Sequence, residues 1–255
     1  MRSIVLILSY DGGPFAGWQR QNGQTTVQGC LEEALSRMHG GRHVDVRGAS
    51  RTDSGVHAEW QVAAFDTDKA YALNRWQQAL NALTPREIYI REVHEAEAGF
   101  HPRFAKKGKR YRYLIWEGSF LPPCLLGRAM TSRPLDIENM QRAANYLLGE
   151  HDFSSFRAID CQARTPVRTL TGIEITRQAA PFVVPAFGRE HEGVIQIDVE
   201  GTAFLKQMVR IIVGTLVEFG LGREASEMEA ILEARQRSCA GETAPACGLT
   251  LVQSL

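Results

Sequence analysis

The chain has 255 residues, and its 29 Lys and Arg balance 29 Asp and Glu, so that it carries no net charge at neutral pH. Its 44% hydrophobic and 23% charged content is that of a globular protein with one large domain or two small ones, which excludes disordered and fibrous classes. No apolar run approaches the roughly 18 to 20 residues that a membrane span needs. Five scattered cysteines, without a C-x-x-C pair or a Cys/His cluster, argue against a disulfide framework and a structural metal.

The first half of the chain predicts the order strand, helix, strand, strand, helix, strand. The N-terminal stretch is read as a first strand of a cytoplasmic protein, because Asp11 and two glycines stand where a signal peptide would be cleaved. Apolar residues at helical spacing predict a helix over residues 26–39 and a second helix that Asp68 caps and that stops before Pro85. Strands are expected over residues 3–10, 43–49, 60–66 and 87–93.

The second half repeats this arrangement in element order only. One helix is expected between the N-cap Asp136 and a C-cap at Gly149, and a very apolar one over residues 203–219. Residues 178–192, with two prolines, are expected to form an irregular connection. Strands are expected over residues 110–116, 168–176 and 194–200.

This order predicts an α+β fold with two ferredoxin-like lobes, each a split βαβ unit with its helices on one face of a mixed, mainly antiparallel sheet. Residues 1–100 would form the first lobe and residues 101–255 the second. A central cleft is expected between the two lobes.

An acid-free stretch from Ala98 to Trp116 interleaves cations with aromatic residues. Such a stripe is typical of nucleic-acid-binding surfaces, although a solvated charge run on a strand edge explains it equally well. Its cations are Arg103, Lys106, Lys107, Lys109, Arg110 and Arg112.

Two further features could carry chemistry. Residues 48–58 are mostly small and hold Asp53, and small residues permit another backbone to approach closely, although Asp-Ser-Gly is also ordinary turn chemistry. In the apolar helix, Arg210 must meet a carboxylate or a phosphate, because a buried guanidinium cannot lose its proton. It either forms a structural ion pair or orients and ionises a catalytic aspartate.

Six segments, collinear over almost the whole chain, resemble the tRNA pseudouridine synthase A (TruA) family. Ser50 and Ser54 depart from the family pattern, which usually has Gly and Ala there. The segments are YDG with FAGWQRQ (residues 10–21), GASRTDSGVHA (48–58), FHPRF with KRYRY (100–113), DFSSFR (152–157), CQARTP (161–166) and MVRIIVG (208–214).

The resemblance implies a role for each matching residue. Asp53 would be the catalytic aspartate, Tyr111 would stack on the target base, and Arg210 would pair with Asp53. Arg51 would fill the gap left by the flipped nucleotide. Contacts with RNA are expected from His101, Arg103, Gln162 and Arg164, and from Lys106, Lys107 and Lys109 of the basic stripe.

The implied reaction converts uridine to pseudouridine at tRNA positions 38, 39 and 40, with no cofactor, in a homodimer. A single ionised Asp53 beside a permanent cation suits it, because a carboxylate can attack C1′ or C6 or abstract a sugar proton; the sequence does not choose among these routes. A glycosidase would need a second carboxylate, and none lies near Asp53 in sequence. The alternative is a non-catalytic RNA-binding protein on ferredoxin-like lobes, which explains the stripe but not an Asp and an Arg in one cleft.

Overall fold

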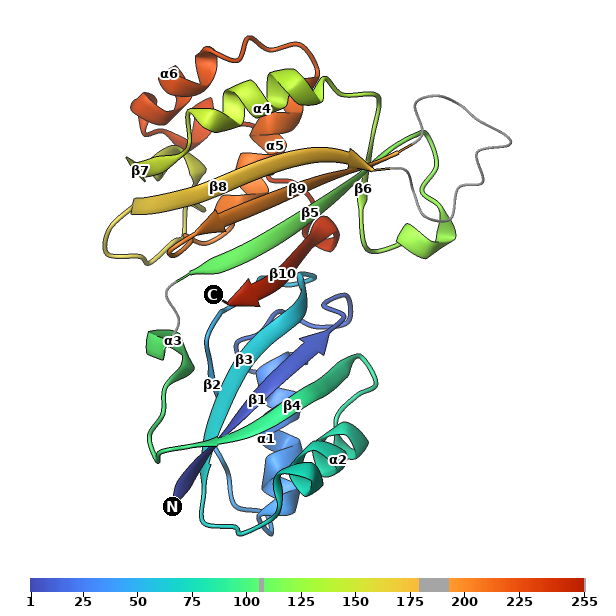
Figure 1. Cartoon of the computed structure of the whole chain (residues 1–255), viewed down its shortest axis with the longest axis vertical. Coiled ribbons are helices and arrows are strands. Elements are labelled where there is room, and N and C mark those ends of the chain that lie inside the picture. Colours follow the sequence, from blue (N-terminus) through green and yellow to red (C-terminus); the bar gives the residue numbers. More distant parts are fainter. Residues whose placement is uncertain (106–107, 179–192, 255) are drawn as a thin grey trace. The chain divides into compact units, whose positions relative to one another are not determined.

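The computed structural model describes residues 1–105, 108–178 and 193–254, and the connection expected over residues 178–192 lies almost wholly outside them. The described residues form an α+β fold of helices and mostly antiparallel strands (Figure 1). They divide into two compact units, Met1–Lys107 with Thr250–Leu255, and Gly108–Leu249. Residues 101–105 and 250–254, which the sequence-based division places in the second lobe, lie within the first unit.

The first unit has the strand order β4-β1-β3, with two short strands on the far side of β3. Strand β1 (Arg2–Tyr10) lies between β3 (His57–Thr67) and β4 (Ile88–Ala96), antiparallel to both. Strand β2 (Arg47–Gly48) pairs antiparallel with β3, and β10 (Leu249–Ser254) pairs parallel with it.

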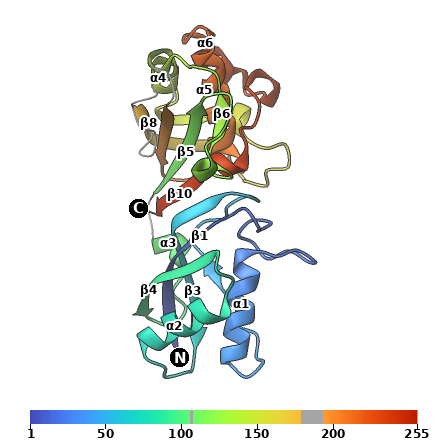
Figure 2. The same ribbon diagram turned by 90° about the vertical axis from the view of Figure 1, so that its right-hand side faces the viewer.

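Helices α1 (Val27–Met38) and α2 (Leu73–Leu83) contact each other beside this sheet (Figure 2). The Thr26 side chain caps α1 by accepting a hydrogen bond from the Gly29 N–H at 3.2 Å. The cap expected at Asp68 is wrong: α2 begins after Ala72, and Asp68 instead binds Arg42 at 2.8 Å.

Strand β2 is also much shorter than the predicted 43–49. Val44 and Val46 are buried as an alternating strand would require. However, the main chain of Val46 binds side chains of α1: its N–H donates to Glu32 Oε1 at 3.2 Å, and its carbonyl accepts from Gln28 at 3.1 Å. Side chains of α1 therefore replace a strand partner at this position.

The second unit has the strand order β5-β9-β8-β7. Strand β5 (Lys109–Glu117) also pairs parallel with the short β6 (Met130–Ser132). Helix α4 (Ile137–Asn145) packs against α5 (Met208–Gly220) and against β8. The other strands are β7 (Gly149–Asp152), β8 (Val167–Gln178) and β9 (Val194–Gly201), all antiparallel to their neighbours in this order. Helix α6 (Glu227–Ala234) also belongs to this unit, whereas α3 (Pro102–Ala105) belongs to the first unit, and neither is part of a sheet.

Two helix ends in this unit differ from the prediction. Asp136 caps α4, accepting from the Asn139 N–H at 2.9 Å, but the helix ends at Asn145, and Gly149, with φ +96°, opens β7. Helix α5 begins at Met208 rather than residue 203, because Gln207 is in the left-handed conformation, with φ 60°, which interrupts a right-handed helix. As predicted, α5 is largely buried, and Val217 is its one partly exposed large apolar residue.

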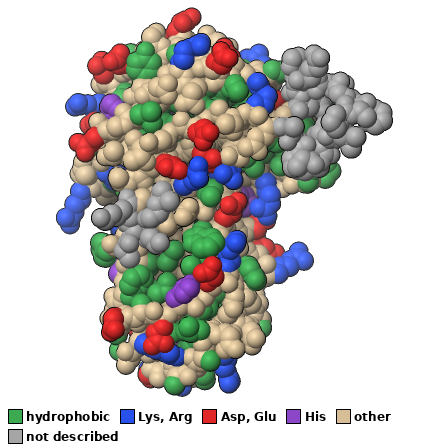
Figure 3. All heavy atoms as spheres, in the orientation of Figure 1, with side chains coloured by type: hydrophobic (Ala, Val, Ile, Leu, Met, Phe, Trp, Pro, Cys, Tyr) green, Lys and Arg blue, Asp and Glu red, His purple; other side chains and the backbone are tan. Residues whose placement is uncertain are grey.

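None of the described helices is long and apolar enough to cross a membrane. The face in Figure 3 carries Lys and Arg interspersed with Asp and Glu, in agreement with the balanced composition.

Candidate active site

The loop between β2 and β3 carries Arg51, Thr52 and Asp53, and the segment that follows β1 holds it. The N–H of Trp18 donates to the Thr52 carbonyl at 3.1 Å, and the N–H of Gly55 donates to the Phe15 carbonyl at 3.3 Å. The first two segments of the family resemblance therefore lie against each other in the fold.

Two glycines make this approach possible. An added Cβ on Gly12 would lie 2.0 Å from the Val56 carbonyl oxygen, and one on Gly17 would lie 2.7 Å from the Thr52 carbonyl oxygen. Gly17 also has φ +91°, which L side chains rarely adopt. The backbone that closely approaches residues 48–58 is thus that of residues 12–18.

Buried polar side chains of β1 and β3 form hydrogen bonds with the loop. The hydroxyls of Tyr10 and Thr52 lie 2.8 Å apart, and the side chain of Gln61 binds both main-chain groups of Ser50. Burial raises the pKa of Tyr10 well above its usual range, so that this phenol stays protonated and able to donate.

The loop residues alternate in exposure. Arg51 is exposed and Asp53 is partly exposed, whereas Thr52 between them is buried. Alternate side chains of the loop therefore point toward solvent and toward the core of the unit.

A buried histidine adjoins the same loop. Nδ1 of His57 accepts a hydrogen bond from the Gly12 N–H at 3.0 Å, and Oδ1 of Asp11 lies 3.1 Å from that nitrogen. His57 is 2% exposed and Asp11 is partly exposed. This contact is a second tie between the loop and the segment after β1.

The second unit carries the other residues implied in the chemistry. Tyr111 lies on β5, buried, with its ring edge-on to Phe204 at 5.2 Å. Arg210 lies in the first turn of α5, is partly buried, and donates from Nε to the Ala244 carbonyl at 2.7 Å. The pairing of Arg210 with Asp53 and the stacking of a base on Tyr111 stay predictions.

Two cations of the basic stripe pair with acidic residues of β9. Arg112 binds Asp198 of β9 at 3.0 and 3.2 Å, and Arg110 lies 3.0 Å from Glu200 of the same strand. These two cations are therefore neutralised within the sheet, although the acid-free sequence around them suggests free positive charge. Lys109 is partly buried at the start of β5, while Lys106 and Lys107 lie outside the described residues.

The other residues implied in RNA contact lie in surface segments. His101 precedes α3, and Arg103 is exposed on α3. The ring of His101 lies 4.8 Å from that of the exposed Phe104. Gln162 and Arg164 are exposed in the loop before β8.

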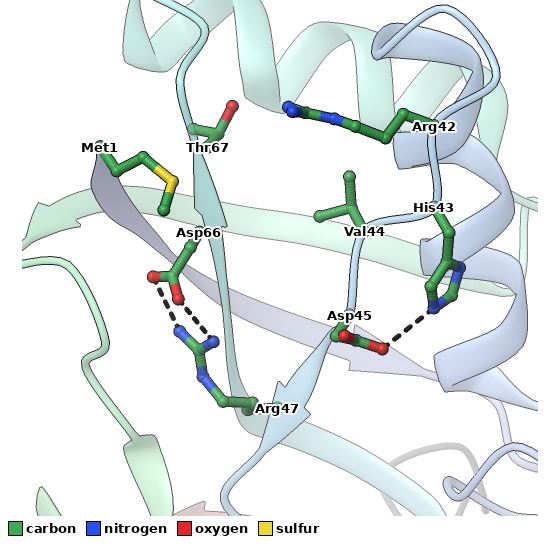
Figure 4. Close-up of a pocket in the computed structure, with 8 residues that line it drawn as sticks. All are labelled: Met1, Arg42, His43, Val44, Asp45, Arg47, Asp66 and Thr67. Atoms are coloured by element: carbon green, nitrogen blue, oxygen red, sulfur yellow. Dashed lines mark hydrogen bonds and ion pairs between the residues drawn. The ribbon is translucent and has the colours of Figure 1, made fainter.

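A pocket of about 250 Å³ lies beside β3. In it, Arg47 forms an ion pair with Asp66 (Figure 4). Nearby, His43, Asp45 and Glu32 could offer ligand atoms to a metal ion. However, Arg20 and Gln28 both bind the Glu32 carboxylate at 2.8 Å. The Glu32 carboxylate is thus already engaged, and this cluster does not fit a metal site.

Sequence reasoning missed Tyr10 and Gln61 as supports of the loop. Tyr10 stands inside a matched segment, and Gln61 is an uncharged polar residue within an apolar strand. A polar residue that a strand pattern directs into the core is the signal that could have found Gln61, since such groups are buried only with partners.

The chain is similar to known proteins over nearly its whole length. A family model described as tRNA pseudouridine synthase matches residues 6–105 and 143–254. A protein of Acetivibrio thermocellus called tRNA pseudouridine synthase A is 45% identical over 99% of both chains. Proteins of the same name are 42% identical in Ruminiclostridium cellulolyticum, over 99% of both chains, and 41% identical in Pectobacterium atrosepticum, over 98% of this chain and 84% of the other.

Proposed function

The chain belongs to the tRNA pseudouridine synthase family, and on that premise we propose that Asp53 is the catalytic group with which it isomerises uridine in tRNA to pseudouridine. The observation that carries the proposal is the loop itself. Its backbone is fixed by the segment after β1, while the Asp53 side chain is left partly exposed. A carboxylate that is both held in place and accessible is what the reaction needs.

The reaction breaks the bond between N1 of uracil and C1′ of the ribose, turns the ring, and joins C5 to C1′. An Asp53 carboxylate can attack C1′ or C6, or take a sugar proton. The target uridine must leave its stack, at a cost of a few kcal/mol, and an aromatic ring such as that of Tyr111 can recover part of this energy.

The remaining roles follow the family resemblance. Arg210 is the ion-pair partner of Asp53, and Arg51 fills the gap left by the extruded nucleotide. The anticodon stem-loop binds through His101, Arg103, Gln162 and Arg164. The acid-free basic stripe, rather than the resemblance, adds the lysines 106, 107 and 109. The substrate uridines are those at positions 38, 39 and 40.

The architecture that we propose has two ferredoxin-like lobes with the catalytic residues of both in a central cleft, in a cytoplasmic homodimer. The strand order β4-β1-β3-β2 and the paired helices of the first unit support its ferredoxin-like assignment. Sedimentation of the purified chain tests the dimer.

Asp53→Asn tests the catalytic assignment, because the amide removes the charge and little contact surface. We expect pseudouridine formation in tRNA to be abolished while tRNA affinity changes by no more than a few-fold. Asp45→Asn is a matched control, since the Asp45 side chain is 87% exposed in the same unit, and it should retain full activity. Turnover of Asp53→Asn at a tenth of wild type or more would reject Asp53.

The wild-type products separate the classes of function. Analysis of nucleosides and free bases after incubation with tRNA should reveal pseudouridine. Free uracil would indicate a hydrolase, and unchanged uridine an RNA-binding protein. Anticodon stem-loops that carry one uridine, at position 38, 39 or 40, test the target positions.

A further inference from the structure

Gln61 makes an unusual contact with the loop that carries Asp53. Its side chain is completely buried on β3, and its amide binds both main-chain groups of Ser50. The Ser50 N–H donates to Oε1 at 3.2 Å, and Nε2 donates to the Ser50 carbonyl at 2.7 Å. One side chain thus satisfies both main-chain polar groups of one loop residue.

The contact stands where the loop separates from the sheet. Gly48 pairs with Ala63, and the Ala49 N–H still reaches the Val62 carbonyl at 2.8 Å. At Ser50 the side-chain amide of Gln61 replaces the partner that a strand backbone would supply, because an amide has the same donor and acceptor as a peptide group. The backbone can therefore leave β3 without burying unpaired main-chain groups at Ser50.

The neighbouring contacts fix the residues on both sides of Arg51. Ser50 is held by Gln61, and the buried Thr52 is held by the Tyr10 hydroxyl and by the Trp18 N–H. The Tyr10 hydroxyl also interacts with the Gln61 side chain, so the supports are connected. Asp53 follows Thr52 directly, and its backbone starts from this fixed point.

We propose that Gln61 is a positioning residue for catalysis, which holds residues 50–52 so that the Asp53 side chain points toward the target nucleotide. This inference rests on the proposed role of Asp53. Gln61 touches no substrate and acts through the loop. Displacement of a reacting group by about 1 Å can cost about 100-fold in rate, so loss of this contact should lower kcat more than it raises KM.

Gln61→Glu provides a test, because a protonated carboxyl reproduces the amide: its carbonyl oxygen accepts from the Ser50 N–H and its O–H donates to the Ser50 carbonyl. The ionised form has no donor and repels that carbonyl. Burial raises the pKa of the introduced carboxyl, so the amide-like form is favoured as pH falls. The ratio of variant to wild-type kcat should be reduced about tenfold or more at pH 9 and rise toward 1 near pH 6.

The other ionisable groups around this position do not produce the same profile. Tyr10, from β1, stays protonated over this range because its pKa is raised by burial. Arg51 and Asp53, on the loop, and His57, on β3, are present in both proteins, and the ratio of rates removes their own titration. The remaining pH dependence therefore belongs to the introduced carboxyl.

Gln77→Glu is the matched control. Gln77 lies on α2 of the same unit, and its amide also donates to main-chain carbonyls, those of Ile90 at 3.2 Å and Arg91 at 2.7 Å. This variant should lose some stability, with kcat unchanged at every pH. A Gln61→Glu variant whose ratio to wild type stays near 1 from pH 6 to pH 9 would overturn the proposal, as would a purely structural loss that lowers Tm and leaves kcat intact.

Gln61→Met covers the case in which the glutamate variant unfolds at alkaline pH, since methionine fills a similar volume without polar groups. We expect a lower kcat at all pH values with KM for tRNA within a few-fold, and a wild-type kcat would refute the role. Asp53→Asn keeps the two proposals apart. If it retains turnover, the proposed function fails; if it is inactive and both Gln61 variants keep wild-type kcat, only the positioning role fails.

Discussion

Arg47 holds Asp66 through two hydrogen bonds, of 2.8 Å from Nη1 to Oδ2 and 3.0 Å from Nη2 to Oδ1 (Figure 4). Asp66 also accepts from the Ser3 hydroxyl and, at 3.1 Å, from the Gly99 N–H, and Arg47 Nε donates to the Phe100 carbonyl at 3.2 Å. The pair thus fastens the segment that leads to His101 and Arg103.

Asp66→Asn should lower stability in a pH-dependent manner. The Arg47 hydrogen bonds hold the Asp66 pKa well below its usual range, so this carboxylate stabilises the fold above its unfolded pKa, and the contribution fades as pH falls toward its folded pKa. We expect a loss of about 1 to 2 kcal/mol at pH 7, limited by solvent screening of the pair, and a smaller difference from wild type near pH 3. Urea unfolding across this pH range measures it. Asp68→Asn, in the more exposed pair with Arg42, should have a smaller effect at pH 7, and an equal effect would contradict the special role of Asp66.

Gly17→Ala should impair both stability and activity, because the added Cβ would meet the Thr52 carbonyl beside Asp53. Gly23→Ala is the control: Gly23 also has a positive φ, of +72°, but nothing lies within 4 Å of its Cβ position. Both variants carry the backbone strain, so the excess cost at Gly17, about 1 to 3 kcal/mol, reports the close approach. Thermal unfolding and turnover of both variants check this. Equal losses of stability and activity in the two variants would show that the loop moves to accommodate the added Cβ without cost.

Arg210→Leu should lose activity at neutral pH and recover part of it as pH rises. Without its proposed cation, the Asp53 carboxyl would be harder to ionise at neutral pH, and more alkaline conditions would restore the charge. Stability should fall by about 1 to 3 kcal/mol, since the carbonyl of the buried Ala244 loses the Arg210 donor. A pH profile of kcat tests this, and wild-type turnover at neutral pH would mean that Arg210 serves another acid.

Arg103→Ala and Arg164→Ala should weaken tRNA binding without unfolding the protein, because both side chains are exposed. Each lost phosphate contact should flatten the log-log salt dependence of affinity by about 0.7 to 0.9. Arg37→Ala removes an exposed arginine that pairs with Glu33 on α1, and it should leave the slope unchanged. A slope unaffected by both Arg103→Ala and Arg164→Ala would place the RNA elsewhere.

The sequence by itself determined the order of most elements and several of their ends. Thr26 and Asp136 cap their helices through bonds that span three residues, so the necessary partners are already present in the local sequence. The same holds for the apolar face of α1 and for the matched segments, whose residue types are visible without the fold. Family membership was therefore predictable from residues alone.

Only the tertiary structure decided which polar groups satisfy one another. Arg112 binds Asp198, 86 residues away, and Arg110 lies 3.0 Å from Glu200, so that two of the six cations of the basic stripe are neutralised within the sheet. Asp68 binds Arg42 instead of capping α2, and the side chain of Gln61 pairs with Ser50 where a strand backbone would otherwise do so. Strand register and packing choose such partners, because a polar or charged side chain binds the complementary group that the fold brings near it. The spacing of residues in the sequence does not reveal which groups the fold brings together.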